Sequence, residues 1–291
     1  MQKTKISYLS HSWNPISMRC TPMSAGCQNC WHLAMAKRLA KNPLIPKAER
    51  EAYAGGPPVL REKELKTPLH LKKPARIGVQ FMGDLFYEKI NPEWVREIYH
   101  VMHNAPQHSF FILTKRAKRM ASWYNWIGRN WTPWPLPNLH LGVSIEDQKT
   151  ADERISILFK IPAAHRWVSI EPCLNEVNIE PYLRCRGCGY SSKDKALHGD
   201  HRLCTDPTGV LDFIVLGGET GPGARPLHPD WVRSIKEQCV AANIPFYFKN
   251  WGDCPYPHNS DISDWIIVGY DPYIRKDNCF LDGKNWKEIP K

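Results

Sequence analysis

The sequence has 291 residues, of which 42% are hydrophobic and 23% are charged, and its formal net charge is +10. This balance is typical of a globular protein, and no apolar run approaches the length of a membrane span, which excludes a membrane protein of the helical kind. The excess of positive charge favours a polyanionic partner, and nucleic acid is the first candidate.

The chain contains ten cysteines, and its first residues, "MQKTKISYLSHSW", include no apolar segment of the kind that directs secretion. We therefore expect a cytoplasmic protein in a reducing compartment. In such a compartment cysteines are free thiols or metal ligands, and disulfides are rare.

The first informative segment is "MRCTPMSAGCQNCWHLAMAKRLAKN", residues 18–42, in which Cys20, Cys27 and Cys30 precede a helix-like pattern. These thiols could bind zinc with His32 as a fourth ligand, or could be small core residues. The third interpretation is a 4Fe-4S cluster. Such clusters normally have four cysteine ligands, so a set of three leaves one iron open to a non-protein ligand. An open iron can bind S-adenosylmethionine and support radical chemistry.

Apolar runs typical of buried strands alternate with amphipathic helical patterns over most of the remaining chain. The expected strands lie within residues 76–86, 108–115, 139–146, 165–172, 211–219 and 244–252, and the expected helices within residues 91–105, 115–128, 147–160 and 228–243. Alternation of this kind predicts an α/β fold with parallel strands and right-handed crossovers. Our first choice is a single domain, residues 1–291, that forms a complete or partial (β/α) barrel of the TIM type, and an open doubly wound sheet is the second.

Charged residues close six of these strands, and the active sites of barrels lie at the carboxyl ends of strands. We therefore expect one mouth to gather Asp84, Lys115, Glu146, Glu171, Glu219 and Lys249. We expect two of the six to be helix caps or ion-pair partners, and the predicted catalytic residues are Lys115, Glu146, Glu171 and Lys249.

Two further segments carry polar or aromatic patterns. The loop "GGETGPGARP" contains Gly217, Gly218, Glu219 and Arg225, and flexible glycines beside an arginine suit a phosphate or carboxylate group. Four tryptophans lie among basic residues, where they could stack on bases or form an aromatic edge of the core: Trp123, Trp126, Trp131 and Trp134.

A polar, glycine-rich insertion at residues 181–208 interrupts the alternation. It contains Cys185 and Cys188, then His198, His201 and Cys204, which is the spacing of zinc ligands. A long loop without a core needs such a cross-link to be ordered. We expect zinc to bind the three cysteines and His201, in preference to His198. The alternative is a disordered insertion with incidental thiols.

Several motifs together resemble a family of proteins. They are "SWNPISMRCTPMSAGCQNCWHLAMAKRLA", "FMGDLF", "FILTKRAKRM", "LGVSIEDQKTADERI", "VLGGETGPGARPLHPDWVRSIKEQC" and "PFYFKNWG". The chain resembles, over nearly its whole length, the phage- and prophage-associated three-cysteine-motif family, whose members look like radical S-adenosylmethionine proteins. The resemblance implies a barrel that carries a 4Fe-4S cluster on Cys20, Cys27 and Cys30 at its carboxyl-terminal mouth.

The chain departs from the wider radical superfamily at two places. Six residues separate Cys20 from Cys27, a longer gap than the superfamily pattern, whereas the gap of two between Cys27 and Cys30 agrees with it. In the superfamily a Gly-Gly-Glu segment near the cluster binds the amine of the cofactor. Here Gly83 and Asp84 take that place, and a true Gly-Gly-Glu follows only at residues 217–219. Either segment could bind S-adenosylmethionine.

Two functions of different classes follow. The resemblance implies an enzyme that uses a one-electron reductant to form a 5′-deoxyadenosyl radical, which modifies or repairs a nucleotide or nucleic acid. The alternative is a non-catalytic nucleic-acid-binding protein whose cluster and zinc are structural or redox-sensing. A separate protein partner is left open in both cases.

Overall fold

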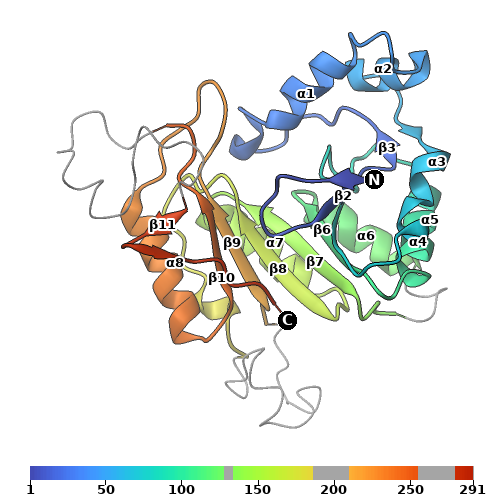
Figure 1. The fold of residues 1–291 in the computed structure, drawn as a ribbon. Helices are drawn as coiled ribbons and strands as arrows, with labels where there is room; N and C mark the ends of the chain where they lie inside the picture. The colour runs from blue at the N-terminus through green and yellow to red at the C-terminus, as the bar shows by residue number, and fades with distance from the viewer. Residues whose placement is uncertain (128–133, 186–209, 255–278, 291) are drawn as a thin grey trace. The chain divides into compact units, whose positions relative to one another are not determined.

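The computed structural model describes residues 1–127, 134–185, 210–254 and 279–290, and its main sheet has eight strands (Figure 1). The strand order is β1-β2-β5-β6-β7-β8-β9-β10. β1 is antiparallel to β2, whereas β2–β5, β5–β6, β8–β9 and β9–β10 are parallel pairs. The α/β fold with a mostly parallel sheet is therefore confirmed.

The contacts divide the chain into two compact units. Unit 1 comprises residues 1–142 and 161–165, and unit 2 comprises residues 143–160 and 166–291. β7 (Leu139–Ile145) and β8 (His165–Ile170) contribute residues to both. Each unit is described by itself below.

Among the described residues, unit 1 contains the amino-terminal strands and six α-helices. Its sheet strands are β1 (Gln2–Lys3), β2 (His11–Trp13), β5 (Arg76–Val79) and β6 (Ser109–Thr114). Its helices are α1 (Trp31–Leu39), α2 (Lys47–Ala54), α3 (Glu62–Leu65), α4 (Thr67–His70), α5 (Pro92–His103) and α6 (Ala117–Ile127). A small antiparallel ladder joins β3 (Ile16–Ser17) to β4 (Val59–Leu60).

Helix α5 begins as its sequence predicts. Asn91 accepts a hydrogen bond from the backbone N–H of Glu93 at 3.0 Å, and Pro92 occupies the first helical position. Ile98 and Met102, four residues apart, are fully buried. This buried stripe is what fixes the helix on the core of unit 1.

The strand expected within residues 76–86 is shorter than predicted, because it ends at Val79. Gln80 follows with a left-handed φ of 54°. Its side chain accepts from the backbone N–H of Ile16 at 3.0 Å and donates to the Ile16 carbonyl at 2.8 Å. The backbone N–H of Gln80 still donates to the carbonyl of Trp13 in β2 at 2.8 Å, and the residues that follow form a loop.

Unit 2 alternates strands and helices as expected. It contains α7 (Gln148–Phe159), β9 (Phe213–Gly217), α8 (Pro229–Ala241) and β10 (Phe246–Asn250), and also the short elements β11 (Phe280–Leu281) and β12 (Lys284–Asn285). Asp147 and Thr150 form a reciprocal capping box at the start of α7. In the part of the chain that the structure describes, no helix is long and apolar enough to cross a membrane.

Candidate functional site

Three cysteines gather in the loop before α1. Cys27 ends a short 3-10 helix, η1 (Ala25–Cys27), and is buried, whereas Cys20 and Cys30 are partly exposed, and all three are free thiols. After burial, which is the largest cause, interaction with Cys27 raises the pKa of both Cys20 and Cys30, and interaction with Cys30 raises that of Cys20. The sequence motif is therefore also a cluster in space.

Two cations at the carboxyl end of β6 face this cysteine cluster. Arg116 donates from Nη2 to the carbonyl of Thr21 at 2.9 Å, which fastens the cysteine loop to the strand end. Burial raises the pKa of both Cys20 and Cys30, and the positive charges of Arg116, near Cys20, and of Lys115, near Cys30, partly offset that rise. Neighbouring cations favour the thiolate, which is the form that binds metals.

Burial and the neighbouring cations have opposite effects on the pKa of the thiols. Desolvation, with the charge of Asp84 as the next cause, raises the pKa of Cys20 to about 12. Desolvation also raises the pKa of Cys30, although backbone N–H groups of His32 and Leu33 work against it. Without a metal the Cys20 and Cys30 thiols are therefore protonated near neutral pH, and metal binding must release their protons.

Asp84 joins the loop after β5 to the end of β6. Its Oδ1 accepts from the backbone N–H of Phe86 at 2.9 Å and from the Thr114 hydroxyl at 2.7 Å. Its Oδ2 accepts from the backbone N–H of Lys115 at 3.1 Å and from Nη1 of Arg116 at 3.4 Å. A carboxylate offers about four lone-pair sites, and these donors use them. Binding of a cofactor ammonium by Asp84, which stays a prediction, would have to displace one of them.

Gly83 places this loop against the segment that leads to the cysteines. It has a φ of 119°, which other residues adopt only with strain, and an added Cβ would lie 2.8 Å from Sδ of Met18. The predicted role of Gly83 near the cofactor is thus accompanied by a structural one, which is close packing beside the cysteine loop.

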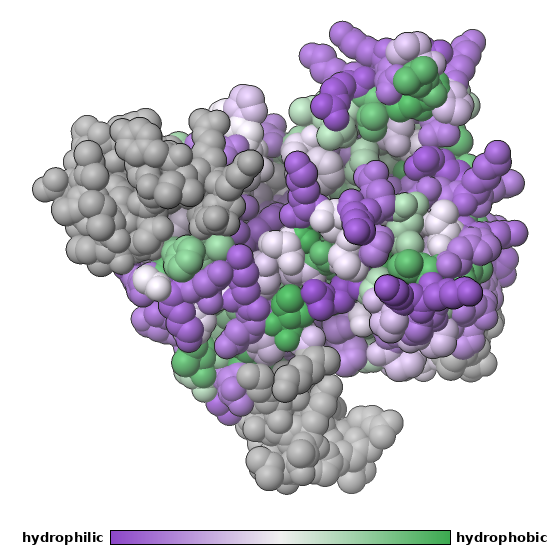
Figure 2. Space-filling model, in the orientation of Figure 1, coloured by the Kyte–Doolittle hydropathy of each residue, from purple (hydrophilic) through white to green (hydrophobic). Residues whose placement is uncertain are grey.

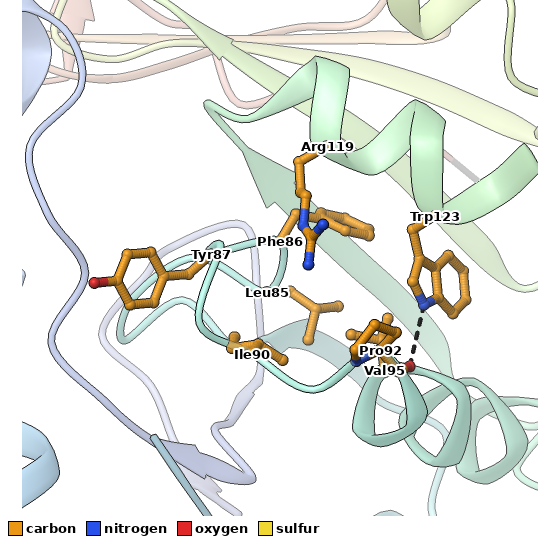
Figure 3. Close-up of a pocket in the computed structure, with 8 residues that line it drawn as sticks. All are labelled: Leu85, Phe86, Tyr87, Ile90, Pro92, Val95, Arg119 and Trp123. Atoms are coloured by element: carbon orange, nitrogen blue, oxygen red, sulfur yellow. Dashed lines mark hydrogen bonds between the residues drawn. The ribbon is translucent and has the colours of Figure 1, made fainter. Parts of the chain in front are cut away.

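An apolar pocket lies behind the same loop (Figure 3). It is lined by Leu85, Phe86, Tyr87, Ile90, Pro92, Val95, Arg119 and Trp123. The indole N–H of Trp123 donates to the carbonyl of Pro92 at 3.1 Å, drawn as a dashed line in Figure 3. Tyr87 points away from the other side chains drawn, and the guanidinium of Arg116 lies 5.2 Å from its ring centre. This packing anchors the loop that carries Asp84.

Unit 2 brings two of the predicted catalytic residues together. Nζ of Lys249, near the end of β10, lies 2.6 Å from Oε1 of Glu171, which follows β8. The hydroxyl of Ser169 donates to the other carboxylate oxygen at 2.7 Å. Gly217 leaves room for this pair, because an added Cβ would lie 3.0 Å from the Glu171 oxygen.

Glu219 and Arg225 form a two-pronged ion pair. Nη2 of Arg225 donates to Oε1 at 2.6 Å and Nε donates to Oε2 at 2.8 Å. The hydrogen bond to Glu219 is the largest cause that raises the pKa of Arg225. Position 218 requires a glycine because the backbone of Trp251 passes close to it: an added Cβ would lie 2.1 Å from the carbonyl oxygen of Trp251.

Glu146 is fully buried and accepts from Nη1 of Arg154 at 3.1 Å. The same nitrogen donates to the carbonyl of Ser144 at 2.6 Å. Asp84, Glu146, Glu171, Glu219 and Lys249 therefore each have an ion-pair partner, which is more than the two structural roles that the sequence analysis expects. An ion pair does not remove a residue from catalysis, and their catalytic roles and common mouth stay predictions.

The predicted zinc ligands fall mostly outside the described residues. Cys185 lies within them and is buried, whereas Cys188, His198, His201 and Cys204 lie outside them. Within the described ranges, no group of three or more His, Cys, Asp or Glu side chains converges on one metal ion. The cysteine cluster is thus not arranged around a single ion. Thiolates of a multi-iron cluster bind different iron atoms and do not converge in this way.

Sequence reasoning missed Arg116 in this region and considered His32 only as a fourth zinc ligand. Arg116 was overlooked beside Lys115, although the pair "KR" directly after a strand could have drawn attention to both. His32 is buried, and neither ring nitrogen has a hydrogen-bond partner. Burial, and then the charge of Arg19, lowers the pKa of His32 to about 4, so its imidazole is neutral.

Comparisons with known proteins identify one family. A family model described as "Protein of unknown function (DUF5131)" matches residues 3–290, which is almost the whole chain. No curated protein and no solved structure matches the chain significantly.

Proposed function

The chain belongs to the DUF5131 family, and we propose that it is a radical S-adenosylmethionine-type iron-sulfur enzyme that modifies or repairs a nucleotide or nucleic-acid substrate. One observation carries this proposal. Three free thiols share one loop, and Arg116 fastens that loop to the carboxyl end of a parallel strand. The carboxyl ends of parallel strands are where α/β proteins place their chemistry.

The residues present fit a 4Fe-4S cluster by the chemistry of their donor atoms. Cys20, Cys27 and Cys30 supply thiolates, the soft ligands that select iron-sulfur clusters or zinc. Arg116 and Lys115 supply positive charge next to Cys20 and Cys30. Such charge offsets that of three thiolates in a partly buried loop.

When bound, a cluster with three thiolate ligands supplies an open iron and one electron for the cleavage of S-adenosylmethionine to a 5′-deoxyadenosyl radical. The chain's own residues have other tasks. Arg116 fixes the cysteine loop through Thr21, and Asp84 fixes the loop after β5 against the same strand end. Both contacts hold the thiols in place before metal binds, which reduces the cost of ordering them.

The segment that binds the cofactor is either Gly83–Asp84 or Gly217–Glu219 with Arg225, and in each case a present contact must give way. At Glu219 a ligand ammonium would replace Arg225, whose side chain is 28% exposed. At Asp84 it would replace one of four donors, two of which are backbone N–H groups. A complete or partial barrel and the zinc knuckle belong to the same proposal.

The second candidate is a non-catalytic nucleic-acid-binding protein with a structural or redox-sensing cluster. The ion pairing at the strand ends favours it, above all the buried pair of Glu146 and Arg154, whose side chains are 1% and 5% exposed. A carboxylate held in this way stabilises the fold and does not need to meet a substrate.

Anaerobic reconstitution with iron and sulfide tests the cluster itself. The parent chain should turn brown and hold about four irons, whereas Cys20→Ala, Cys27→Ala and Cys30→Ala variants should lose most of them. Cys239→Ala is the matched control, because Cys239 is a buried free thiol outside the cluster. A parent that takes up only zinc, or a control that loses as much iron as the other variants, would contradict the cluster.

A further inference from the structure

The positive charge of the chain is concentrated at its amino-terminal end. Residues 1–48 contain no Asp or Glu, and the first acidic residue is Glu49. The same residues include seven basic side chains, so most of the formal net charge of +10 resides there: Lys3, Lys5, Arg19, Lys37, Arg38, Lys41 and Lys47. The segment that holds the cysteine cluster is therefore the most basic part of the protein.

Helix α1 collects this charge on one face. The side chains of Trp31, Lys37, Arg38 and Lys41 are exposed, whereas those of His32 and Ala36 on the other side are buried. The spacing of the exposed residues is that of one helix face, which continues into the turn after α1. We call Trp31, Lys37, Arg38 and Lys41 the α1 face.

The cations of the α1 face have no acidic partner among the described residues. Arg38 donates to Sδ of Met35 at 3.0 Å, and nearby Arg19 donates to the carbonyl of Ala54 at 3.5 Å. Neither contact neutralises a charge. Figure 2 shows long hydrophilic side chains over the region of α1 and α2. A surface of this kind attracts polyanions.

Trp31 adds an aromatic side chain at the cysteine end of this face. It is 48% exposed, although it follows Cys30 directly in the chain and begins α1. Its indole meets the ring of His32 edge to face, with ring centres 6.2 Å apart. An exposed tryptophan beside a row of cations is the combination that binds single strands, because unpaired bases stack on it while cations follow the phosphates.

We propose that the α1 face binds a single-stranded nucleic acid, with Lys37, Arg38 and Lys41 along its backbone and Trp31 stacked on one base. This inference rests on the proposed function, since it names the substrate class and the direction from which it reaches the cysteine cluster. From residue 31 to residue 41 the face extends about 15 Å. At about 3.4 Å per nucleotide of a stacked strand, that length covers about four nucleotides. The stacked base would be the one closest to Cys30.

Fluorescence anisotropy with a short labelled single strand of mixed sequence tests the proposal on the full chain. Lys37→Gln, Arg38→Gln and Lys41→Gln together should reduce the slope of log affinity against log salt by about 2, since each contact to a single strand contributes about 0.7. Trp31→Ala should weaken binding about tenfold or more without changing the slope. Trp31→Phe should retain part of the affinity.

The matched control removes three exposed cations elsewhere in unit 1, at Lys66, Lys72 and Lys73. It changes the net charge equally and should leave the salt slope nearly as it is in the parent. Equal loss in the control, or no loss in the α1 variants, would overturn the proposal. So would a duplex of the same sequence, or polyglutamate, that binds as tightly as the single strand.

Iron content separates this result from the proposed function. The α1 face residues are not cluster ligands, so the triple variant should still reconstitute and bind S-adenosylmethionine. If it keeps the cluster and binds the strand like the parent, the α1 face proposal fails and the proposed function stands. If the parent holds no cluster but the triple variant loses the strand, the proposed function fails and the α1 face stands.

Discussion

Arg116 is the residue whose replacement tells most about the candidate site. Its side chain is 4% exposed and makes contacts in three directions: to Thr21 in the cysteine loop, to Asp84, and to Glu88, whose side chain is 60% exposed. Arg116→Gln keeps a polar side chain but removes the positive charge and the several N–H donors of the guanidinium. The carbonyl of Thr21 and one oxygen of Asp84 then lose a donor.

The expected cost follows from these contacts. Breaking a buried ion pair by removing one partner costs about 3–5 kcal/mol. Asp84 keeps three other donors, from Phe86, Thr114 and Lys115, and the exposed pair with Glu88 contributes little. We therefore expect the variant to lose about 3 kcal/mol of unfolding free energy, at the lower end of that range, measured by urea denaturation.

The more specific effect concerns iron. Without the bond to Thr21 the cysteine loop is freed from β6, so the variant should take up much less iron at a temperature where it remains folded. Arg154→Gln is the matched control, because Arg154 is similarly buried and paired with Glu146, but belongs to unit 2, whereas the cysteines belong to unit 1. It should be destabilised to a similar degree and still load iron once it is reconstituted. Full iron loading of Arg116→Gln, or equal loss of iron in both variants, would show that Arg116 does not position the cysteine loop.

Three other predictions concern the rest of the chain. Gly218→Ala should cost at least about 3 kcal/mol, because its Cβ would clash with the backbone of Trp251, whereas Gly221→Ala, with open space but a φ of 100°, should cost only about 1 kcal/mol in urea denaturation. Burial raises the pKa of the Cys173 thiol from 9.0 to about 12. Between these pH values the folded protein keeps the Cys173 proton and the unfolded chain loses it, so the free energy of unfolding falls as pH rises. Cys173→Ser should reduce that alkaline loss by about 1.4 kcal/mol per pH unit, and an unchanged pH profile would contradict this cause. Cys185→Ser should remove zinc from metal analysis but spare the iron, and loss of both metals would show that the two sites are not separate.

Much of the fold follows from the sequence. All six apolar runs contain a strand and all four amphipathic patterns contain a helix, because buried parallel strands and their crossovers have strong periodicity. The residues of Asn91-Pro92 and Asp147 also indicate where helices α5 and α7 begin. Two- and three-residue strands such as β1 and β2 have no such pattern, and their place in the sheet is set by partners far along the chain.

The candidate site could be predicted only in part. The cysteine spacing predicts a cluster of thiols, and the structure brings them close to each other. No sequence pattern shows that Arg116 reaches back 95 positions to Thr21, or that Glu219 is paired with Arg225. Such contacts depend on loop conformations. The left-handed turn at Gln80, which redirects the chain before Asp84, is held by a long-range bond to Ile16 and has no local signal.

We propose that the cysteine cluster supports the reductive cleavage of S-adenosylmethionine. Anaerobic incubation of reconstituted protein with dithionite and S-adenosylmethionine, followed by chromatography for 5′-deoxyadenosine, measures this reaction. The parent chain should form 5′-deoxyadenosine and the Cys27→Ala variant should form none, while Cys239→Ala should behave like the parent. A brown, fully loaded parent that binds S-adenosylmethionine but forms no 5′-deoxyadenosine would contradict the enzymatic claim and favour the structural or redox-sensing cluster.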